Sequence, residues 1–518
     1  MKHKRRLSAL CVALAIVQPA AHAANLTWDA NSATALRPNI VFIFSDDHSI
    51  QAIGAYNTWL SAFCREHQVT PHIDRLAAEG AVFVNSFCGN SLCSPSRATV
   101  LTGLHSHANG VRRLEQPITP GLWTYPVSLR QAGYQTAIIG KWHLATTKPE
   151  FDYWRILPGQ GAYENPGFIG PSGPEPHQGY ASDVITELAL DWLKQRDPAK
   201  PFFLAVQHKA PHRNWIPPAR YSKWLDDATV PEPTTLFDDY AHRGSPAHDQ
   251  EMSIGPDMTL ASDLKVGERY AGDPRYLARN VDFQQRKPAG SELIRWKYQQ
   301  YMKDYLRCVK SVDDSVGRVM GALKATGLEK NSIVIYASDQ GFFNGEHGWF
   351  DKRWIYEESL HMPLIVNWPG VVKPGSRFTP FVQNIDYAPT FVEMAGGKIP
   401  GGLHGRSLVP ILRGETPGDW RQSVYYHYYD HDGAHNVANH YGVRTERYTL
   451  ANFYPVKEWE LYDLEKDPLE LNSVYHNPDY APTVRMLETE LARLRALYQD
   501  NDPLETGRQK DQARPSRK

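Results

Sequence analysis

Residues 39–45 read Asn-Ile-Val-Phe-Ile-Phe-Ser, and Asp46 and Asp47 follow them directly. An apolar, β-branched run of this length that stops at charged residues is typical of a strand buried on both faces of a sheet. Four similar runs occur further along the chain, at residues 136–140, 202–206, 333–337 and 363–367. The sequence therefore predicts a mainly parallel sheet covered by helices.

Helical patterns lie between the predicted strands. One helix is predicted to begin at Thr70-Pro71 and to end at Gly80, because proline is tolerated in a first turn and glycine often follows a last one. Residues 181–195 and about 291–326 are helical in pattern as well. Strands that alternate with helices indicate an α/β fold, here with a large sheet sandwiched by helices.

The composition is that of an ordinary globular protein. Of 518 residues, 42% are hydrophobic and 22% charged, which excludes a disordered, collagen-like or coiled-coil chain. The 56 Lys and Arg nearly balance the 57 Asp and Glu, so we expect no nucleic-acid partner. Beyond residue 23 the chain has four cysteines, too few for a disulfide framework, and their spacing matches no zinc site.

The first 23 residues differ in character from the rest. A basic start, an apolar run too short to span a bilayer and a small-x-small site at 21–23 predict a secretory signal peptide at 1–23. We therefore expect a secreted or periplasmic protein. No later stretch of about 18 uninterrupted apolar residues exists, so no membrane anchor is expected.

The remainder divides into a large domain, a smaller one and a tail. Residues 24–415 hold the predicted buried strands, together with a polar excursion at 225–290 that lacks periodicity and is expected to run over the surface. From residue 416 the pattern changes to short aromatic strands and then to an amphipathic helix, which predicts an α+β domain at 416–500. Residues 501–518 are expected to form a disordered tail.

Polar side chains stand where four of the predicted strands end. Ligands of open α/β sheets bind at the carboxyl ends of the strands, so these side chains are expected to converge on one edge. They are Asp46 and Asp47, Lys141 and His143, His208 and His212, and Asp339 and Gln340. Carboxylates that share an edge need a counter-ion, because repulsion and desolvation would otherwise raise their pKa values. Three carboxylates with an amide oxygen suit a hard cation, Ca²⁺ or Mg²⁺.

For each of these Asp residues the alternative is a structural role. A single Asp-Asp pair after a strand is more often a helix cap or a solvated turn. Two strand ends that each deliver an Asp followed by a second oxygen ligand are harder to explain in this way, so a cation site is predicted.

The strongest local signal is Cys93-Ser94-Pro95-Ser96-Arg97, which Leu101-Thr102-Gly103 follows. Proline at position 95 is acceptable in a first helical turn and Ser94 is a candidate cap, so Cys93 is expected at a helix N-terminus. Such a position stabilises an anion through partial positive charge and unpaired N–H groups. Taken alone, it suggests a thiolate nucleophile of low pKa.

Segment 93–97 with Thr102-Gly103 resembles the signature of the type I sulfatases, in which the cysteine is oxidised after translation to formylglycine and its hydrated aldehyde is the nucleophile. Other segments match the family in the same order along the chain, namely Asp46-Asp47, 133–136, 140–143, 210–212, 338–341 and 345–348. The resemblance runs from Pro38 to Asn472. It implies an alkaline phosphatase-like fold, a sulfatase catalytic domain at 24–415, and a formylglycine-generating or maturation enzyme that acts on the cysteine.

The resemblance also implies roles for the matching residues. The expected metal ligands are Asp46, Asp47, Asp339, Gln340 and an oxygen of residue 93, around Ca²⁺ with Mg²⁺ as the alternative. The expected catalytic residues are Cys93, Arg97, Lys141 and His143, together with His212 and Lys352 at the sulfate. Either His212 or Lys352 donates a proton to the leaving oxygen, and His143 is the expected base. Gln340 departs from the family, in which many members have Asn.

The surroundings of this site are rich in groups that suit carbohydrate, because aromatic faces stand beside charged hydrogen-bonding side chains. The candidate sugar-binding residues are His347, Asp351, Arg353 and His440, and for His347 the alternative is a role in the pocket wall. The nearby tryptophans include Trp142, Trp215, Trp349 and Trp354. For each tryptophan the alternative is packing in the core or in a lid. Residues 348–358 and 440–446 are similar to bacterial polysaccharide sulfatases, including the N-acetylglucosamine-6-sulfatase-like group.

The function that the resemblance implies is hydrolysis of a sulfate ester on a carbohydrate, such as a fragment of glycosaminoglycan, mucin or algal polysaccharide. Two alternatives remain open. One is a phosphonate monoester hydrolase or phosphodiesterase of the same superfamily, which can share the metal site and the modified cysteine. The other is an inactive carbohydrate-binding paralogue.

Overall fold

A computed structural model describes residues 37–145, 149–502 and 504. The predicted signal peptide at 1–23 and most of the predicted tail lie outside the described residues. Within the described residues of that predicted tail, Asp502 forms an ion pair of 2.6 Å with Arg112.

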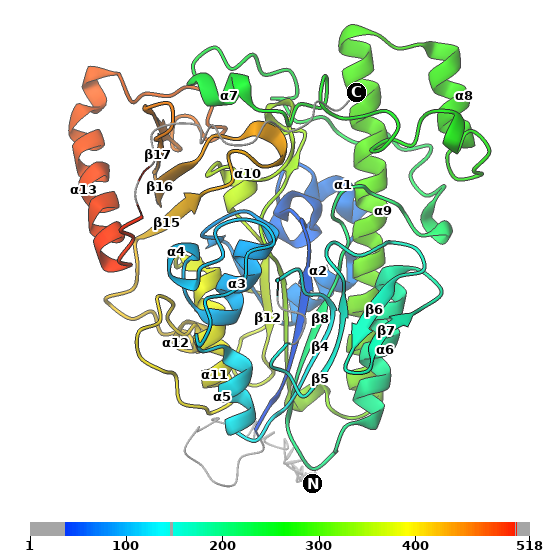
Figure 1. Cartoon of the computed structure of the whole chain (residues 1–518), viewed down its shortest axis with the longest axis vertical. Helices are drawn as coiled ribbons and strands as arrows, with labels where there is room; N and C mark the ends of the chain where they lie inside the picture. The colour runs from blue at the N-terminus through cyan, green and yellow to red at the C-terminus, as the bar shows by residue number, and fades with distance from the viewer. Residues whose placement is uncertain (1–36, 146–148, 503, 505–518) are drawn as a thin grey trace, which may run out of the picture.

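A ten-stranded sheet forms the centre of the molecule, in the order β13-β2-β12-β9-β1-β8-β4-β5-β6-β7 (Figure 1). Its five middle strands are mutually parallel: β9 (Ser332–Ser338), β1 (Asn39–Ser45), β8 (Phe202–Gln207), β4 (Gln135–Lys141) and β5 (Tyr153–Leu157). The outer strands are β13 (Ser376–Phe378), β2 (Ala81–Phe83), β12 (Leu364–Asn367), β6 (Gly167–Gly170) and β7 (Gly173–Pro176). The prediction of a large, mainly parallel sheet is confirmed.

The run at 363–367 differs from the other predicted strands. It forms β12, which pairs antiparallel with both β9 and β2. A fully apolar run reports burial on both faces and carries no information about direction, so the sequence pattern could not distinguish this strand from its parallel neighbours.

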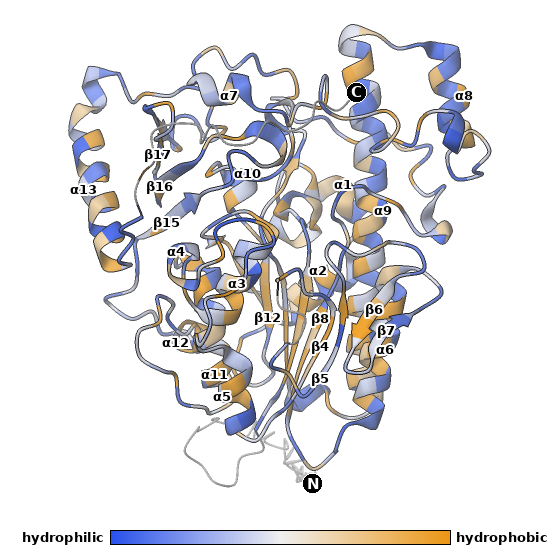
Figure 2. Ribbon diagram, in the orientation of Figure 1, coloured by the Kyte–Doolittle hydropathy of each residue, from blue (hydrophilic) through white to orange (hydrophobic). Residues whose placement is uncertain are grey.

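Helices cover both faces of the sheet. One face packs against α2 (Pro71–Glu79), α6 (Ala181–Gln195) and α9 (Gly290–Ala325), and the other against α3 (Cys93–Thr102), α5 (Tyr125–Gln131) and α11 (Tyr387–Met394). Strand β1 divides its side chains between the two cores, because Ile40, Phe42 and Phe44 face one and Val41 and Ile43 the other. Figure 2 shows the apolar residues gathered on the strands and on the inner faces of these helices.

The segment 225–290, which lacks periodicity in sequence and was expected to run over the surface, has more regular structure and more burial than its sequence pattern indicated. It contains the helices α7 (Ser245–Asp249) and α8 (Leu277–Arg286). It also buries apolar side chains completely, among them Met252 and Ile254. Helix α8 escaped the sequence pattern because it makes its apolar contact through few side chains, of which Phe283 packs against Trp296 of α9 at 4.9 Å between ring centroids.

A second, antiparallel sheet of four strands follows in the C-terminal part. Its strands are β15 (Ser423–Tyr428), β16 (His440–Thr445), β17 (Tyr448–Phe453) and β18 (Glu458–Asp463). Helix α13 (Ala481–Leu497) covers it with Leu487, Leu491 and Leu494. This smaller unit lies beside the carboxyl ends of the main sheet's strands (Figure 1), where it can contribute to a site.

Short elements complete the chain. They are α1 (Ser61–Glu66), α4 (Ser106–Asn109), α10 (Glu357–Leu360), α12 (Val409–Leu412), β3 (Ser86–Phe87), β10 (Phe343–Asn344), β11 (Phe350–Asp351) and β14 (Val382–Gln383). Within the described ranges, no helix has the length and apolar character needed to cross a membrane. The cysteines of the same ranges are free thiols, all of them buried.

Candidate active site

Three carboxylates meet at the carboxyl ends of β1 and β9. These strands pair in parallel register up to Ser45 and Ser338, so the residues that follow them emerge side by side. Ligand oxygens of Asp46, Asp47 and Asp339 lie within 4.8 Å of one another, and all three side chains are buried. The structure thus brings together the carboxylates that the strand ends predicted.

The backbone at Asp47 is held in an unusual conformation. Its φ is 68°, in the left-handed region that a non-glycine residue adopts at a cost. Tyr305 of α9 donates from its hydroxyl to the Asp47 carbonyl at 2.8 Å and accepts from the Ser49 N–H at 2.9 Å. The Asp47 N–H donates to Asp339 Oδ1 at 3.1 Å. This arrangement turns the Asp47 side chain toward the acidic cluster.

The electrostatics of the cluster call for a cation. Burial and repulsion from Asp46 raise the pKa of Asp339 to about 8, and burial raises the pKa of Asp47 to about 6 although Lys352 opposes it. Burial acts the same way on Asp46, but Lys141, His212 and Arg97 outweigh it and hold its pKa well below the usual range. A divalent cation would let all three carboxylates ionise together.

The fourth predicted ligand, Gln340, also fits. Its Nε2 lies within hydrogen-bond distance of Asp47 Oδ1 and 3.7 Å from Cys93 Sγ, whereas its Oε1 is buried and has no hydrogen-bond partner in the described part of the chain. Asp46 Oδ1 is unpartnered in the same sense. Because a rotation about the Cγ–Cδ bond exchanges amide oxygen and nitrogen, this side chain can present its oxygen to a cation.

Cys93 is the first residue of α3, as predicted, but its environment differs from the expectation. Leu92 is the N-cap and no side chain caps the helix; Ser94, the expected cap, donates to the carbonyl of His143 at 2.6 Å. Burial and the nearby Asp46 raise the pKa of the Cys93 thiol to about 12, which does not support the thiolate of low pKa suggested by the helix terminus.

Three cations surround the cluster, each fixed by acceptors. Arg97 donates to Asp339 Oδ2 at 3.1 Å and to the Gln207 side chain at 2.9 Å. Lys141 donates to Asp46 and, at 2.5 Å, to Gln160. Lys352 lies 2.7 Å from Asp47 Oδ2 through its Nζ. These positive groups are arranged so that an anion at the cluster would meet them together.

Two histidines approach the same place from β4 and β8. A ring nitrogen of His212, a carboxylate oxygen of Asp46 and the sulfur of Cys93 all lie within 4.8 Å of one another. Burial and Lys141 lower the pKa of His143 to about 2 and hold the pKa of His212 well below its usual range. Both rings are therefore neutral before an anion binds.

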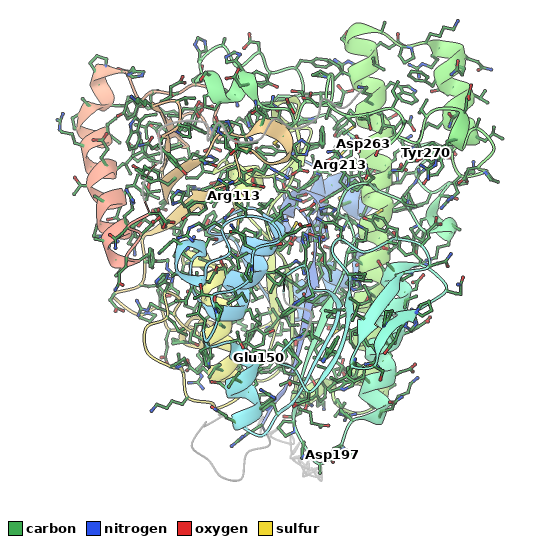
Figure 3. All side chains as sticks on the ribbon, viewed as in Figure 1. Arg113, Glu150, Asp197, Arg213, Asp263 and Tyr270 are labelled. Carbon is green, nitrogen blue, oxygen red and sulfur yellow. The ribbon has the colours of Figure 1, made fainter. Side chains whose placement is uncertain are left out.

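The cluster opens into a cleft of about 730 Å³. Of the predicted residues, Cys93, His212, Asp351, Lys352 and Arg353 line it. Sequence reasoning missed other lining residues, among them Gln160, Tyr163, Glu164, Lys209 and His435. Lys209 precedes the predicted element at 210–212 and could have been included, whereas His435 lies between two C-terminal strands with no local signal. Figure 3 labels Arg213 beside Asp263, which binds it at 2.7 Å.

Two of the predicted sugar-binding residues lie elsewhere. The His347 ring is fully buried between Asp238 at 3.0 Å and Glu358 at 3.8 Å. His440 is also fully buried, with its Nε2 bonded to the Ile355 N–H at 3.1 Å and its Nδ1 to the carbonyl of Ala438 at 2.8 Å. Neither ring lines the cleft, so the sugar-binding assignment of His440 is corrected to packing, and His347 follows its alternative role in support of the wall.

The tryptophans follow the packing alternative. Trp215, Trp349 and Trp354 have no exposed surface, and Trp349 stacks on Trp354 at 4.9 Å between ring centroids. A larger hollow of about 960 Å³ lies between α13 and residues 403–406, but it contains none of the predicted site residues. The predicted residues Cys93, His212, Asp351, Lys352 and Arg353 line the 730 Å³ cleft instead.

A buried acidic cluster ringed by Arg97, Lys141 and Lys352, at the end of a parallel sheet, defines a metal-dependent hydrolase of anionic esters. Residues 38–397 match the family model for sulfatases, and residues 345–497 match the model for the C-terminal part of N-sulphoglucosamine sulphohydrolase. The first match covers more than half of the chain, and the chain belongs to the sulfatase family. Membership implies a formylglycine formed from Cys93 and a divalent metal.

Known relatives include carbohydrate sulfatases. N-acetylglucosamine-6-O-sulfatase of Bacteroides thetaiotaomicron is 42% identical over 496 aligned positions, which span 90% of this chain and 88% of that protein. N-acetylglucosamine-6-sulfatase of Homo sapiens is 27% identical over 422 positions, spanning 76% of this chain and 67% of that protein.

Solved structures share the fold of this chain. A protein in complex with its substrate D-glucosamine-2-N,6-O-disulfate superposes with a TM-score of 0.87 at 42% identity, covering 91% of this chain and 100% of that one. A phosphonate monoester hydrolase of Agrobacterium radiobacter superposes with a TM-score of 0.68 at 22% identity, covering 89% of this chain and 96% of that one. The second likeness shows a shared fold alone.

Proposed function

We propose that the protein removes the 6-O-sulfate from a glucosamine residue of a sulfated carbohydrate. One observation carries this proposal: Asp46, Cys93 and His212 converge within 4.8 Å at the base of a cleft large enough for a sugar. The sugar and the position are supported by the relative of 42% identity and by the structure with bound disulfated glucosamine, which this chain matches over most of its length.

We further propose Ca²⁺ as the cation, held by Asp46, Asp47, Asp339, Gln340 and an oxygen of the modified residue 93. An all-oxygen donor set with carboxylates and an amide suits a hard cation. A set of five protein oxygens favours Ca²⁺, because Mg²⁺ usually keeps several waters and binds one or two carboxylates. When formed, the formylglycine supplies a hydrated aldehyde as nucleophile, and the cation supplies positive charge at the sulfate oxygens.

The protein's own residues bind and orient the ester. Arg97, Lys141 and Lys352 present positive charge where the sulfate lies, and each is held by a carboxylate, so little reorganisation is needed as charge develops. His212 faces the cleft, and once a bound anion has favoured its protonation it can give a proton to the leaving sugar oxygen. His143, a neutral ring whose Nδ1 has no partner in the described chain, is the base that takes a proton from residue 93.

Asp351 and Arg353 are the proposed sugar contacts. They pair with each other at the wall of the cleft, and His435 approaches Asp351 at 3.3 Å from the C-terminal sheet. Charged pairs of this kind discriminate well between hydroxyl positions, because a sugar lacking the right hydroxyl leaves a buried polar group unpaired.

The experiment is a substrate panel measured with matured protein. Glucosamine 6-O-sulfate and its N-acetyl and N-sulfated forms should release sulfate, whereas galactose 6-O-sulfate and an aryl phosphonate monoester should be far poorer substrates. Cys93→Ala should be inactive, and the wild-type peptide containing Cys93 should lose about 18 Da when the thiol becomes an aldehyde. Faster hydrolysis of the phosphonate would establish the alternative reaction, and sugar binding without turnover by the modified protein would establish the inactive binding protein.

We also propose that the chain is exported. Support comes from residues 1–23, whose basic start, short apolar run and small-x-small site have the order of a signal peptide. Amino-terminal sequencing of protein from the periplasm and the medium tests this proposal, and a chain in either that begins at Met1 contradicts cleavage.

A further inference from the structure

Lys209 lies on the segment that carries His212 from the end of β8 to the cleft. The His212 N–H donates to the Lys209 carbonyl at 3.1 Å, so the two residues belong to one tight turn. Lys209 lines the cleft and is 5% exposed, with its Nζ 4.8 Å above the centre of the Tyr163 ring. This amine stands at a fixed place beside the reaction centre.

The other cations that line the cleft have carboxylate partners. Lys352 lies 2.7 Å from Asp47. Arg213 binds Asp263, and Arg353 binds Asp351. Within the described residues no carboxylate forms an ion pair with Lys209, and no side chain or carbonyl accepts a hydrogen bond from its Nζ.

Glu164, a carboxylate that lines the cleft, is paired with another cation. Glu164, next to Tyr163, forms an ion pair of 2.6 Å with Arg275. It therefore does not neutralise Lys209. Burial and the nearby Lys141 lower the pKa of Lys209 to about 8, as expected for an ammonium group withdrawn from water without an anion. The contact between the Lys209 ammonium and the face of the Tyr163 ring offsets only part of this loss of hydration.

We propose that Lys209 binds a second anionic group of the substrate, distinct from the sulfate ester that is cleaved. The reacting sulfate already has Arg97, Lys141 and Lys352 around the acidic cluster. Lys209 lies instead against the wall formed by residues 160–164, and the Tyr163 hydroxyl fixes that wall by donating to the His212 carbonyl at 2.6 Å. An anion on the same sugar or on its neighbour would reach Lys209 while the ester occupies the cluster.

This inference rests on the proposed function and adds a substrate class to it: sugars that carry two anionic groups. A charge-assisted contact to a fixed ammonium gives specificity, because sugars without the second anion leave the ammonium unpaired. The second group can be a sulfate or a carboxylate. The disulfated sugar used below tests the sulfate, and a disaccharide that joins glucosamine 6-O-sulfate to a uronic acid tests the carboxylate in the same assay.

The test compares kcat/KM for glucosamine 6-O-sulfate with that for glucosamine 2-N,6-O-disulfate. Wild-type protein should prefer the disulfate, and Lys209→Met should reduce that preference by about 10- to 100-fold, the effect of removing one charge-assisted hydrogen bond. Lys209→Arg should retain part of it. Lys200→Met, which removes an exposed lysine just before β8, is the matched control and should leave the preference unchanged.

Binding without turnover gives a second readout. Calorimetric titration of the same sugars into the Cys93→Ala protein should show tighter binding of the disulfate, with the difference lost when Lys209→Met is added. Lys209→Gln replaces Lys209→Met if thermal unfolding shows that the latter is not folded. Two results overturn the inference: no preference in wild-type protein, or an equal loss for both sugars, which would place the amine on the reacting sulfate. If wild-type protein desulfates neither sugar, the proposed function itself fails.

Discussion

The Nζ of Lys352 lies 2.7 Å from Oδ2 of Asp47, and the Nε2 of His212 lies 3.8 Å from the same oxygen. One carboxylate thus contacts both candidates for the proton donor. Although burial opposes it, the charges of Asp351 and Asp47 raise the pKa of Lys352 above its usual range, whereas burial and Lys141 keep the pKa of His212 well below its own. Lys352 therefore retains its proton, and a protonated His212 is the stronger acid.

The dependence of kcat on the leaving group should show whether His212 or Lys352 is the proton donor. His212→Ala should lower kcat on a sugar sulfate by about 100-fold or more, the usual contribution of a general acid, and far less on an aryl sulfate whose phenolate leaves without a proton. Lys352→Ala should lower both rates alike, because it removes charge from the sulfate. Sulfate release by the two variants on the two esters is the measurement. The opposite pattern would make Lys352 the donor.

Tyr305 should control cation affinity from outside the ligand set. Tyr305→Phe removes the hydroxyl that bonds the Asp47 carbonyl and the Ser49 N–H, so the left-handed backbone at Asp47 loses its support. Ca²⁺ affinity, measured by calorimetry, should fall by about tenfold. Tyr301→Phe is the control, because that hydroxyl on the same helix bonds the Phe343 carbonyl instead. Equal affinities in the two variants would remove Tyr305 from this role.

Chelation should make stability depend on pH. Asp339 has a pKa of about 8 in the cation-free fold against 3.8 ordinarily, so the folded state binds more protons than the unfolded one between these values. Stability of the chelated protein should therefore fall as pH rises from about 5 to about 8. Saturating Ca²⁺ neutralises the cluster and should abolish most of this slope.

Thermal unfolding with Ca²⁺ or with EDTA across that range measures the effect, and the gap between the two curves should widen with pH. Asp339→Asn should flatten the EDTA curve, because it removes the group with the largest upward shift in the cluster. A gap that stays constant, or narrows with rising pH, contradicts the assignment of a raised pKa to Asp339.

His440 should matter for stability and not for sugar recognition. His440→Ala leaves the Ile355 N–H without its acceptor and opens a cavity beside Trp354, so the free energy of unfolding should fall by about 3 kcal/mol. Urea unfolding measures this loss. KM at a temperature where the variant is folded should match wild type. His476→Ala, at an exposed position, is the control. A raised KM with unchanged stability would return His440 to the sugar site.

The fold was predictable because its central strands are nearly pure apolar runs that end at charged residues. The same strand ends located Asp46 and Asp339, since parallel strands deliver their next residues to one edge. Strand direction was not predictable for 363–367, because burial on both faces is the same in either orientation. Helix α8 was missed because it buries few apolar side chains.

The wall of the cleft was the least predictable part. The family resemblance suggested His347, but its ring does not line the cleft and instead contacts Asp238, a residue of the 225–290 segment. His435 reaches the cleft from the C-terminal sheet, more than 80 residues from Arg353. Sequence patterns report local periodicity, and long-range packing decides which polar side chains become buried supports and which remain accessible.

Cys93 is 1% exposed, and the whole of segment 93–97 is buried at the start of α3. If a maturation enzyme acts on Cys93, it needs access to a segment that the finished fold encloses. We therefore expect conversion of the thiol before the chain has folded, and we expect molecules that fold first to keep the unmodified cysteine.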